Sequence, residues 1–396
     1  MRVASVASSF LPEPGSLERR AYQLARGLAA RGVEVEVLAQ GMAQSPVDVY
    51  GRVTVGRFPA ATGRLRLPVA PGLWERLRGT AGAFDLVDVH SRHGSIALAV
   101  ACARPRRLVF TPGASVEALL RWPRVVPMRA LTARADRIVC RSEFERDLIG
   151  DAIPAAATRT RVISDGVDLD AMREAEPYAT TGALVLAVDR LDRETWVRRA
   201  IASVPSLAPE FWLVVVGDGP ARDRLAAYAA DLRVASRVRF VGAVPDPVLY
   251  RWLRTARVVV TLGRSRGSGA QVTEARAAGA SMVASDLPVN REAAESPGGG
   301  HVILIPADAS PLDVADAIEE AAGVSVLPGA PGADLAPSWR SVVESTWLLY
   351  RQLIDSGVSE PADEHGALLS LAAQATLNGG GAAVSGRSGS AGGAGA

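Results

Sequence analysis

The sequence contains no lysine, and all 44 of its basic residues are arginine. The formal net charge is only +2, so the composition gives no basic footprint for a nucleic acid and no polybasic patch for a membrane surface. Cysteine is also scarce. Cys102 and Cys140 lie in apolar stretches, which predicts buried, reduced thiols rather than a disulfide or a metal pair.

Long apolar runs are missing as well. No run reaches the roughly 18 residues that a membrane-spanning helix requires. The first residues, MRVASVASSF, carry one charged side chain and continue into a glycine-containing loop, so they predict a strand rather than a signal peptide. Together these absences favour a cytoplasmic protein.

The sequence does contain a regular alternation of short apolar strands and amphipathic helices. A strand over Arg2–Ala7, a helix over Leu17–Arg31 and a strand over Val33–Ala39 form one βαβ unit, the building block of a parallel sheet. A second series of such units begins at Ala183. With 396 residues, 48% of them hydrophobic, the chain can form two domains. The expected fold class is α/β, with two Rossmann-like, doubly wound domains facing across a cleft.

The weak periodicity of Asp170–Gly182 indicates a linker between the two series. A strongly amphipathic helix is expected over Trp339–Ile354, and the last residues are mostly Gly, Ala and Ser, which cannot offset the entropy of ordering. The expected division is an N-terminal domain at 1–170, a linker at 171–182, a C-terminal domain at 183–337, C-terminal helices at 338–377, the first crossing back to the N-terminal domain, and a disordered tail at 378–396.

One stretch of the second series has the pattern of a phosphate site. A strand over Val258–Leu262 leads through the loop Gly267–Gly269 into a small-residue helix over Val272–Ala278. Free N–H groups and the helix dipole at such a turn favour an anion. Glu274 is expected in the first turn of the helix, where a carboxylate can reach the ribose hydroxyls of a nucleotide. By itself the loop favours the alternative interpretation, an ordinary βα turn of a parallel sheet.

The order of these elements resembles the retaining glycosyltransferases of family 4, which have the GT-B architecture. The resemblance covers nearly everything from Met1 to Ile354 and depends on several segments. Among them are Pro14–Arg19, GLAARGVEVEVLAQ (27–40), Phe84–Ser91 (FDLVDVHS), Ala135–Val139 followed by Ser142, Arg161–Asp168 (RVISDGVD), Val215–Pro220 (VVGDGP) and Arg237–Val244 (RVRFVGAV). It implies a nucleotide-diphospho-sugar donor in the C-terminal domain and an acceptor in the N-terminal domain. It implies no metal ion and no cofactor.

Several residues match the positions at which the family holds its donor. Arg190 matches an arginine that clamps the diphosphate and takes part in catalysis, and Glu274 matches the glutamate that holds the ribose. The alternatives are a surface arginine after a strand and a carboxylate on a helix face. The other matching positions are Gly15, Gly217, Val244, Gly267, Ser268 and Gly269, of which Gly217 is better explained as a residue that turns the chain.

Four positions depart from the family pattern. Arg266 stands where a glutamate would accept hydrogen bonds from the donor sugar, and Thr195 stands where a lysine would meet the diphosphate. Ser16 replaces a loop glycine, and Gly113 replaces a histidine near the reacting centre. Other side chains can substitute for the lost groups: Arg193, Arg198 or Arg199 for the lysine, Arg266 as an altered catalytic or donor-binding cation, and His90 or His93 on the acceptor side, where a structural role is the alternative.

These observations leave two hypotheses about function. The first, which we favour slightly, is a metal-independent retaining hexosyltransferase with an altered donor-sugar pocket. The second is an inactive GT-B pseudoenzyme that acts as a partner subunit or regulator of an active glycosyltransferase. Acceptor contacts are expected from two variable loops of the N-terminal domain, Gln44–Val55 and Thr62–Leu73, which carry no recognisable code.

Overall fold

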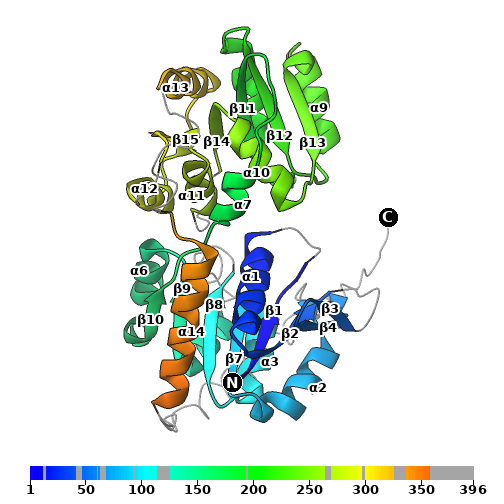
Figure 1. Cartoon of the computed structure of the whole chain (residues 1–396), viewed down its shortest axis with the longest axis vertical. Coiled ribbons are helices and arrows are strands. Elements are labelled where there is room, and N and C mark those ends of the chain that lie inside the picture. Colours follow the sequence, from blue (N-terminus) through cyan, green and yellow to red (C-terminus); the bar gives the residue numbers. More distant parts are fainter. Residues whose placement is uncertain are drawn as a thin grey trace, which may run out of the picture. The chain divides into compact units, whose positions relative to one another are not determined.

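The computed structural model is shown in Figure 1. It describes residues 1–11, 15–41, 47–59, 61–62, 68–91, 94–113, 125–192, 195–263, 269–296, 299–324 and 336–356. The predicted tail and second C-terminal helix lie outside these residues.

The first half of the described chain forms an eight-stranded sheet in the order β10-β9-β8-β7-β1-β2-β4-β3, parallel except for the edge strand β3. Helices cover both of its faces because successive strand residues point to opposite sides. The strands are β1 (Arg2–Ala7), β2 (Glu34–Gln40), β3 (Val47–Tyr50), β4 (Val53–Phe58), β7 (Leu86–Ser91), β8 (Leu108–Pro112), β9 (Arg137–Cys140) and β10 (Thr160–Val162), and the helices are α1 (Ser16–Ala30), α2 (Pro71–Thr80), α3 (Gly94–Ala103), α5 (Val125–Arg134) and α6 (Glu143–Ala152).

The second half forms a six-stranded, parallel sheet in the order β13-β12-β11-β14-β15-β16 among the residues described. Its apolar side chains fill one core on each face. The strands are β11 (Ala183–Val188), β12 (Phe211–Val216), β13 (Val238–Gly242), β14 (Val258–Thr261), β15 (Ser281–Ser285) and β16 (Val302–Ile305), and the helices are α7 (Leu169–Glu174), α8 (Val197–Ser203), α9 (Arg222–Asp231), α10 (Asp246–Thr255), α11 (Ala270–Ala277), α12 (Pro288–Glu295) and α13 (Pro311–Gly323).

The predicted α/β class with two doubly wound sheets is therefore confirmed. Some local expectations were wrong. The predicted loops Gln44–Val55 and Thr62–Leu73 contain β3 and the starts of β4 and α2, whose buried Leu73 and Leu77 pack into the core of the first sheet. Cys140 is buried and free as expected, but Cys102, on α3, is exposed.

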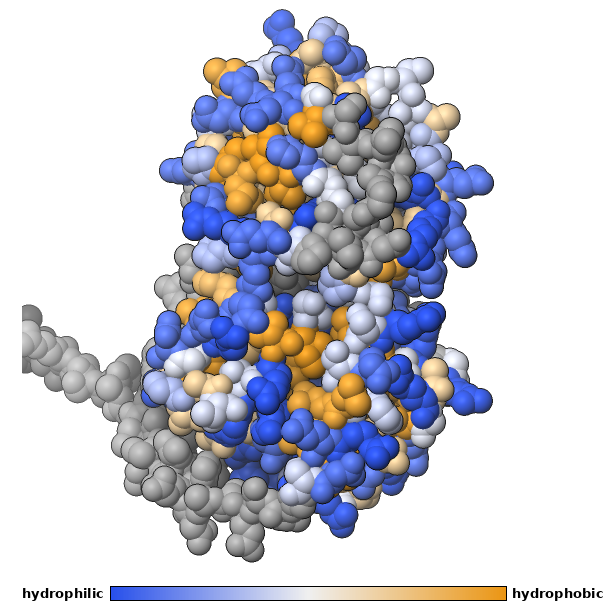
Figure 2. All heavy atoms as spheres, turned by 60° about the vertical axis from the view of Figure 1, so that its left-hand side comes forward, coloured by the Kyte–Doolittle hydropathy of each residue, from blue (hydrophilic) through white to orange (hydrophobic). Residues whose placement is uncertain are grey.

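On the face shown in Figure 2, hydrophilic residues predominate and apolar residues emerge in separate areas. The large apolar side chains that are exposed among the described residues are Val49, Trp74, Leu312 and Leu348. None of the helices described is long and apolar enough to cross a membrane.

Helix α14 (Trp339–Asp355), late in the sequence, packs on the first sheet beside α1. Its buried Leu349, Tyr350 and Leu353 join the core between α1 and the sheet. The Tyr350 hydroxyl donates a hydrogen bond to a carboxylate oxygen of Asp88 on β7, and His90 Nε2 lies 2.8 Å from that same oxygen. Burial raises the pKa of Asp88, but His90 and Tyr350 oppose this effect and the net shift is downward.

Gly217, which follows β12, lies so close to the residue after β11 that no side chain fits between them. On its other side, the Gly217 N–H donates to Gly242 O at the end of β13 over 2.8 Å, and Gly217 has a φ of +132°. A Cβ atom placed on Gly217 would lie 1.8 Å from the carbonyl oxygen of Asp189. Gly217 is therefore required for this approach of the two strand ends.

Replacing Gly217 by alanine should lower the free energy of unfolding by about 3 kcal/mol or more, because both the backbone angle and the contact with Asp189 become unfavourable. The control is Gly79→Ala, since a Cβ at Gly79 meets nothing within 4 Å. That variant should stay within about 1 kcal/mol of the wild type in urea denaturation. Equal stabilities for the two variants would contradict the close approach of the strands.

Removing the hydroxyl of the buried Tyr350 should also destabilise the chain. Tyr350→Phe removes the hydroxyl that donates to the Asp88 carboxylate and leaves His90 as its polar neighbour, and the loss of a buried hydrogen bond to a charged group costs about 1–3 kcal/mol. Tyr228→Phe is the control, because the contact seen for Tyr228 is its ring face, with the Arg198 guanidinium carbon 4.1 Å from the centroid. An equally small effect of both variants on urea unfolding would show that Tyr350 contributes only its ring.

Candidate functional site

The predicted donor residues gather at one edge of the second sheet. Arg190 follows β11, Gly217 follows β12 and Val244 follows β13 by two residues. These strands are parallel neighbours, so their carboxyl ends lie side by side. This edge is where open α/β sheets bind their ligands.

Helix α11 begins at the same edge. Gly269 is its N-cap residue, in the left-handed conformation with φ +71°. Gln271 ties the helix to two strands: its Nε2 donates to Val188 O of β11 over 2.6 Å, and its Oε1 accepts from Thr261 Oγ1 of β14 over 2.7 Å. The start of α11 is thus held beside β11. The predicted site residues Arg266, Gly267 and Ser268 lie outside the described residues.

Glu274 lies in the second turn of α11, not in the first as predicted, because the helix begins at Ala270 rather than at Val272. Its side chain is 13% exposed and forms an ion pair with Arg19 of α1. Burial raises the pKa of Glu274, Arg19 lowers it and nearby Asp246 raises it, with a net upward shift. The carboxylate is therefore poorly solvated and depends on Arg19 for its positive partner.

Arg190 and Thr195 have different surroundings. The Arg190 guanidinium is 57% exposed and is bonded to the equally exposed Asp192 through Nε and Nη2, over 3.0 and 2.9 Å. A ligand phosphate can replace that surface partner. The Thr195 hydroxyl donates to Asp189 Oδ2 over 2.8 Å, and burial raises the pKa of Asp189 to about 6.

Two of the other arginines considered as substitutes for the lysine, Arg198 and Arg199, contact other groups of the protein. Arg199 donates to three backbone carbonyl oxygens, and Arg198 lies over the ring of Tyr228. Arg193 and His93 lie outside the described residues. Thr195 therefore has neither Arg198 nor Arg199 as a neighbouring phosphate ligand.

On the first sheet, the predicted residues do not form one cluster. Gly15 and Ser16 are exposed at the start of α1, and Gly113 follows β8, with its N–H bonded to Ser91 O over 2.9 Å. His90 is completely buried beside Asp88. The structural alternative for His90 accords with this burial better than contact with an acceptor.

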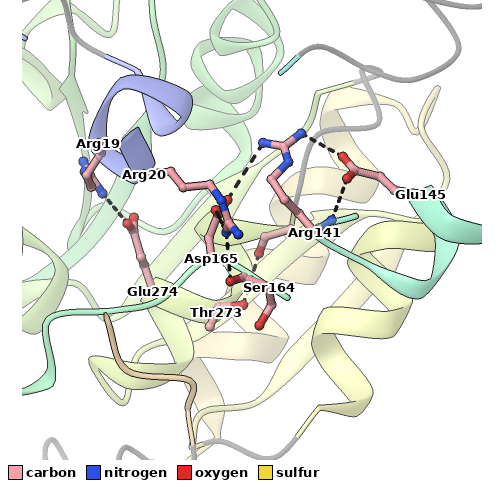
Figure 3. A network of polar contacts seen from close by, with 9 residues as sticks. Arg19, Arg20, Arg141, Glu145, Ser164, Asp165, Thr273 and Glu274 are labelled. Carbon is pink, nitrogen blue, oxygen red and sulfur yellow. Dashed lines mark hydrogen bonds and ion pairs between the residues drawn. The ribbon is translucent and has the colours of Figure 1, made fainter. Parts of the chain in front are cut away.

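The sequence interpretation missed a polar network that extends from α1 in two directions (Figure 3). Arg19 pairs with Glu274 and, through Nη2, with Asp246 Oδ1 at 3.0 Å. The next residue, Arg20, points into the first sheet and donates to Ser164 O over 3.0 Å and to Asp165 Oδ1 over 2.9 Å. Arg19 belongs to a segment matched to the family, but its partners lie more than 200 residues away and no local pattern reveals them.

The residues described contain no group of three or more His, Cys, Asp or Glu side chains that is arranged to hold a metal ion.

Two family models match the chain: Glycosyltransferase Family 4 over residues 17–171 and Glycosyl transferases group 1 over residues 182–323. Among curated proteins, a phosphatidyl-myo-inositol mannosyltransferase of Mycobacterium tuberculosis is 28% identical over 80% of this chain and 85% of its own length. A D-inositol 3-phosphate glycosyltransferase of Catenulispora acidiphila is 27% identical over 90% of this chain and 96% of its own length.

Solved structures share the fold. A sucrose-phosphate synthase from Thermosynechococcus elongatus superposes with a TM-score of 0.73 at 19% identity, over 90% of this chain and 100% of that one. Anabaena HepE in complex with UDP and glucose gives a TM-score of 0.67 at 16% identity, over 90% and 99% of the two chains. Since the two family models together match residues 17–171 and 182–323, the chain belongs to glycosyltransferase family 4, and it has the GT-B fold.

Proposed function

We propose that this chain transfers a sugar, with retention of configuration, from a nucleotide-diphospho-sugar to an acceptor. The observation that carries the proposal is that Arg190 follows β11 and that α11, the helix of Glu274, begins after the neighbouring strand β14 at the same carboxyl edge of the second sheet. A ribose carboxylate, a cation for phosphate and a helix N-terminus are the groups that a nucleoside diphosphate requires.

The proposed chemistry places the protein's positive charge where the leaving diphosphate gains negative charge. Arg190 would exchange its exposed partner Asp192 for phosphate oxygens, and the free N–H groups of α11 would add to the stabilisation. This arrangement needs no metal ion, because a guanidinium and a helix terminus supply the charge. The donor-sugar pocket is altered in sequence at Arg266, where a carboxylate would accept hydrogen bonds from sugar hydroxyls.

The names of two curated relatives suggest an acceptor class, because both contain a phosphorylated inositol. One curated relative is named for phosphatidyl-myo-inositol and another for D-inositol 3-phosphate. Inositol phosphates and phosphatidylinositol are therefore the first acceptors to test. UDP-, GDP- and ADP-sugars form the donor panel, with thermal shift for binding and product analysis for turnover.

The second candidate function is an inactive partner of an active glycosyltransferase. The observation that favours it concerns Thr195, which stands where the family has a lysine for the diphosphate. Its hydroxyl donates to Asp189 and supplies no positive charge. Turnover of any donor in the panel excludes this candidate. Absence of both binding and turnover at millimolar donor would overturn the enzyme proposal and leave the partner function.

Two variants should separate ribose binding from phosphate binding. Glu274→Ala should weaken the binding of nucleoside and nucleoside diphosphate alike, by about 1–3 kcal/mol, because it removes a charged hydrogen-bond acceptor. Arg190→Ala should weaken the nucleoside diphosphate more than the nucleoside. Calorimetric titration measures both, and Glu320→Ala, an exposed carboxylate on α13, is the control. Equal losses for the two ligands in Arg190→Ala would place Arg190 away from the phosphates.

The half-buried Asp189 predicts a dependence of stability on pH. Its pKa of about 6 is above the ordinary value of 3.8, so folding favours the protonated form and stability falls as pH rises from about 4 through 6. Asp189→Asn cannot ionise, yet its amide oxygen can still accept from Thr195. Its melting temperature relative to the wild type should therefore rise between pH 4 and pH 7. Asp231→Asn, on the exposed face of α9, is the control for charge. A pH-independent difference for Asp189→Asn would contradict this account.

A further inference from the structure

The strongest feature that the proposed donor chemistry does not yet use is Arg19. It lies on α1, which packs on the first sheet, yet its guanidinium reaches two carboxylates that belong to helices of the second sheet. Nη1 pairs with Glu274 Oε1 of α11, and Nη2 lies 3.0 Å from Asp246 Oδ1 of α10. The side chain is 24% exposed, so water screens these pairs only in part.

The hydrogen bonds of the neighbouring Arg20 fix the orientation of Arg19. Its neighbour Arg20 is 1% exposed and is bonded to Asp165 and to the carbonyl oxygen of Ser164. Adjacent helix residues point about 100° apart, so the buried Arg20 sets the rotation of α1 and directs Arg19 toward Glu274. Figure 3 shows these two arginines leaving the same helix in different directions.

We propose that Arg19 is a positioning residue of the donor site, which holds the Glu274 carboxylate ionised and oriented so that it can accept hydrogen bonds from ribose hydroxyls. This inference depends on the proposed function of the site. A carboxylate has two oxygens and about four lone-pair positions, so Arg19 can keep Oε1 while hydroxyl groups approach Oε2. Donor binding at the second sheet then requires a residue of the first.

The charges around Glu274 explain why it needs this cation. Asp246 and Asp165 both raise the pKa of Glu274, and Tyr250 of α10 adds a buried phenol to the same surroundings. Burial raises the pKa further, and Arg19 is the group that opposes these effects. A protonated Glu274 would offer ribose one acceptor fewer and would lack the negative charge that strengthens the bond.

The test is a double-mutant cycle on nucleotide binding. UDP, GDP and ADP, each with its nucleoside, are titrated calorimetrically into the wild type, Arg19→Gln, Glu274→Gln and the double variant. Arg19→Gln should weaken the nucleoside and the diphosphate by the same factor, about tenfold, and should have little effect once Glu274 is already glutamine. Arg19→Lys should restore part of the affinity. Arg26→Gln, an exposed arginine on the same helix, should bind as the wild type does.

A pH profile separates positioning from a general effect on folding. Without Arg19 the pKa of Glu274 should rise, so Arg19→Gln should lose affinity on acidification at a higher pH than the wild type, while Arg19→Lys should stay near the wild-type profile. Additive effects of Arg19→Gln and Glu274→Gln, a larger loss for the diphosphate than for the nucleoside, or an unshifted profile would overturn this inference and leave the proposed function standing. A wild type that binds none of the three nucleotides would overturn both.

Discussion

Parallel strand pairing is the constraint on which the candidate donor site depends. In the order β13-β12-β11-β14, every strand ends at the same edge, so residues that are distant in sequence become neighbours there. The approach is close enough that Gly217 has no space for a Cβ beside the Asp189 carbonyl. Gln271 then fixes the start of α11 to this edge through hydrogen bonds with both β11 and β14. The glycine and the glutamine thereby fix the geometry of the edge where Arg190 and the start of α11 lie.

Much of this arrangement could be predicted from the sequence, because hydrophobic periodicity and glycine turns are local signals. The predicted bounds of β1 agree with the structure residue for residue, and the second series begins with β11 at Ala183, as predicted. Helix α14 was equally clear from its amphipathic pattern. Short elements at the edge of the first sheet were not, because β3 and α2 carry weak patterns and depend on the neighbours that they pack against.

The long-range polar contacts could not be predicted in the same way. Nothing in the sequence near Arg19 indicates that its partner is Glu274. The two residues lie on helices that pack on different sheets, and no fixed sequence separation relates such a pair. The surroundings of His90 have the same origin in part: Asp88 is its neighbour on β7, but the Tyr350 hydroxyl that bonds Asp88 comes from α14, which only the tertiary fold brings to this strand. Arg190 follows β11 and Glu274 lies on α11, which begins after β14, and the roles that the family match implies for them stay predictions.

The packing of α14 on the first sheet has a consequence for synthesis on the ribosome. The first sheet has all of its strands once Val162 has been made, but Leu349, Tyr350 and Leu353, which complete its core, emerge almost 200 residues later. Until then the nascent first half presents an apolar groove beside α1 and an Asp88 carboxylate that lacks the Tyr350 hydroxyl. Chains of this size commonly fold domain by domain as they emerge. Here the domain that is synthesised first is completed last. Between the synthesis of Val162 and that of α14, a chaperone could bind the apolar surface that α14 later covers.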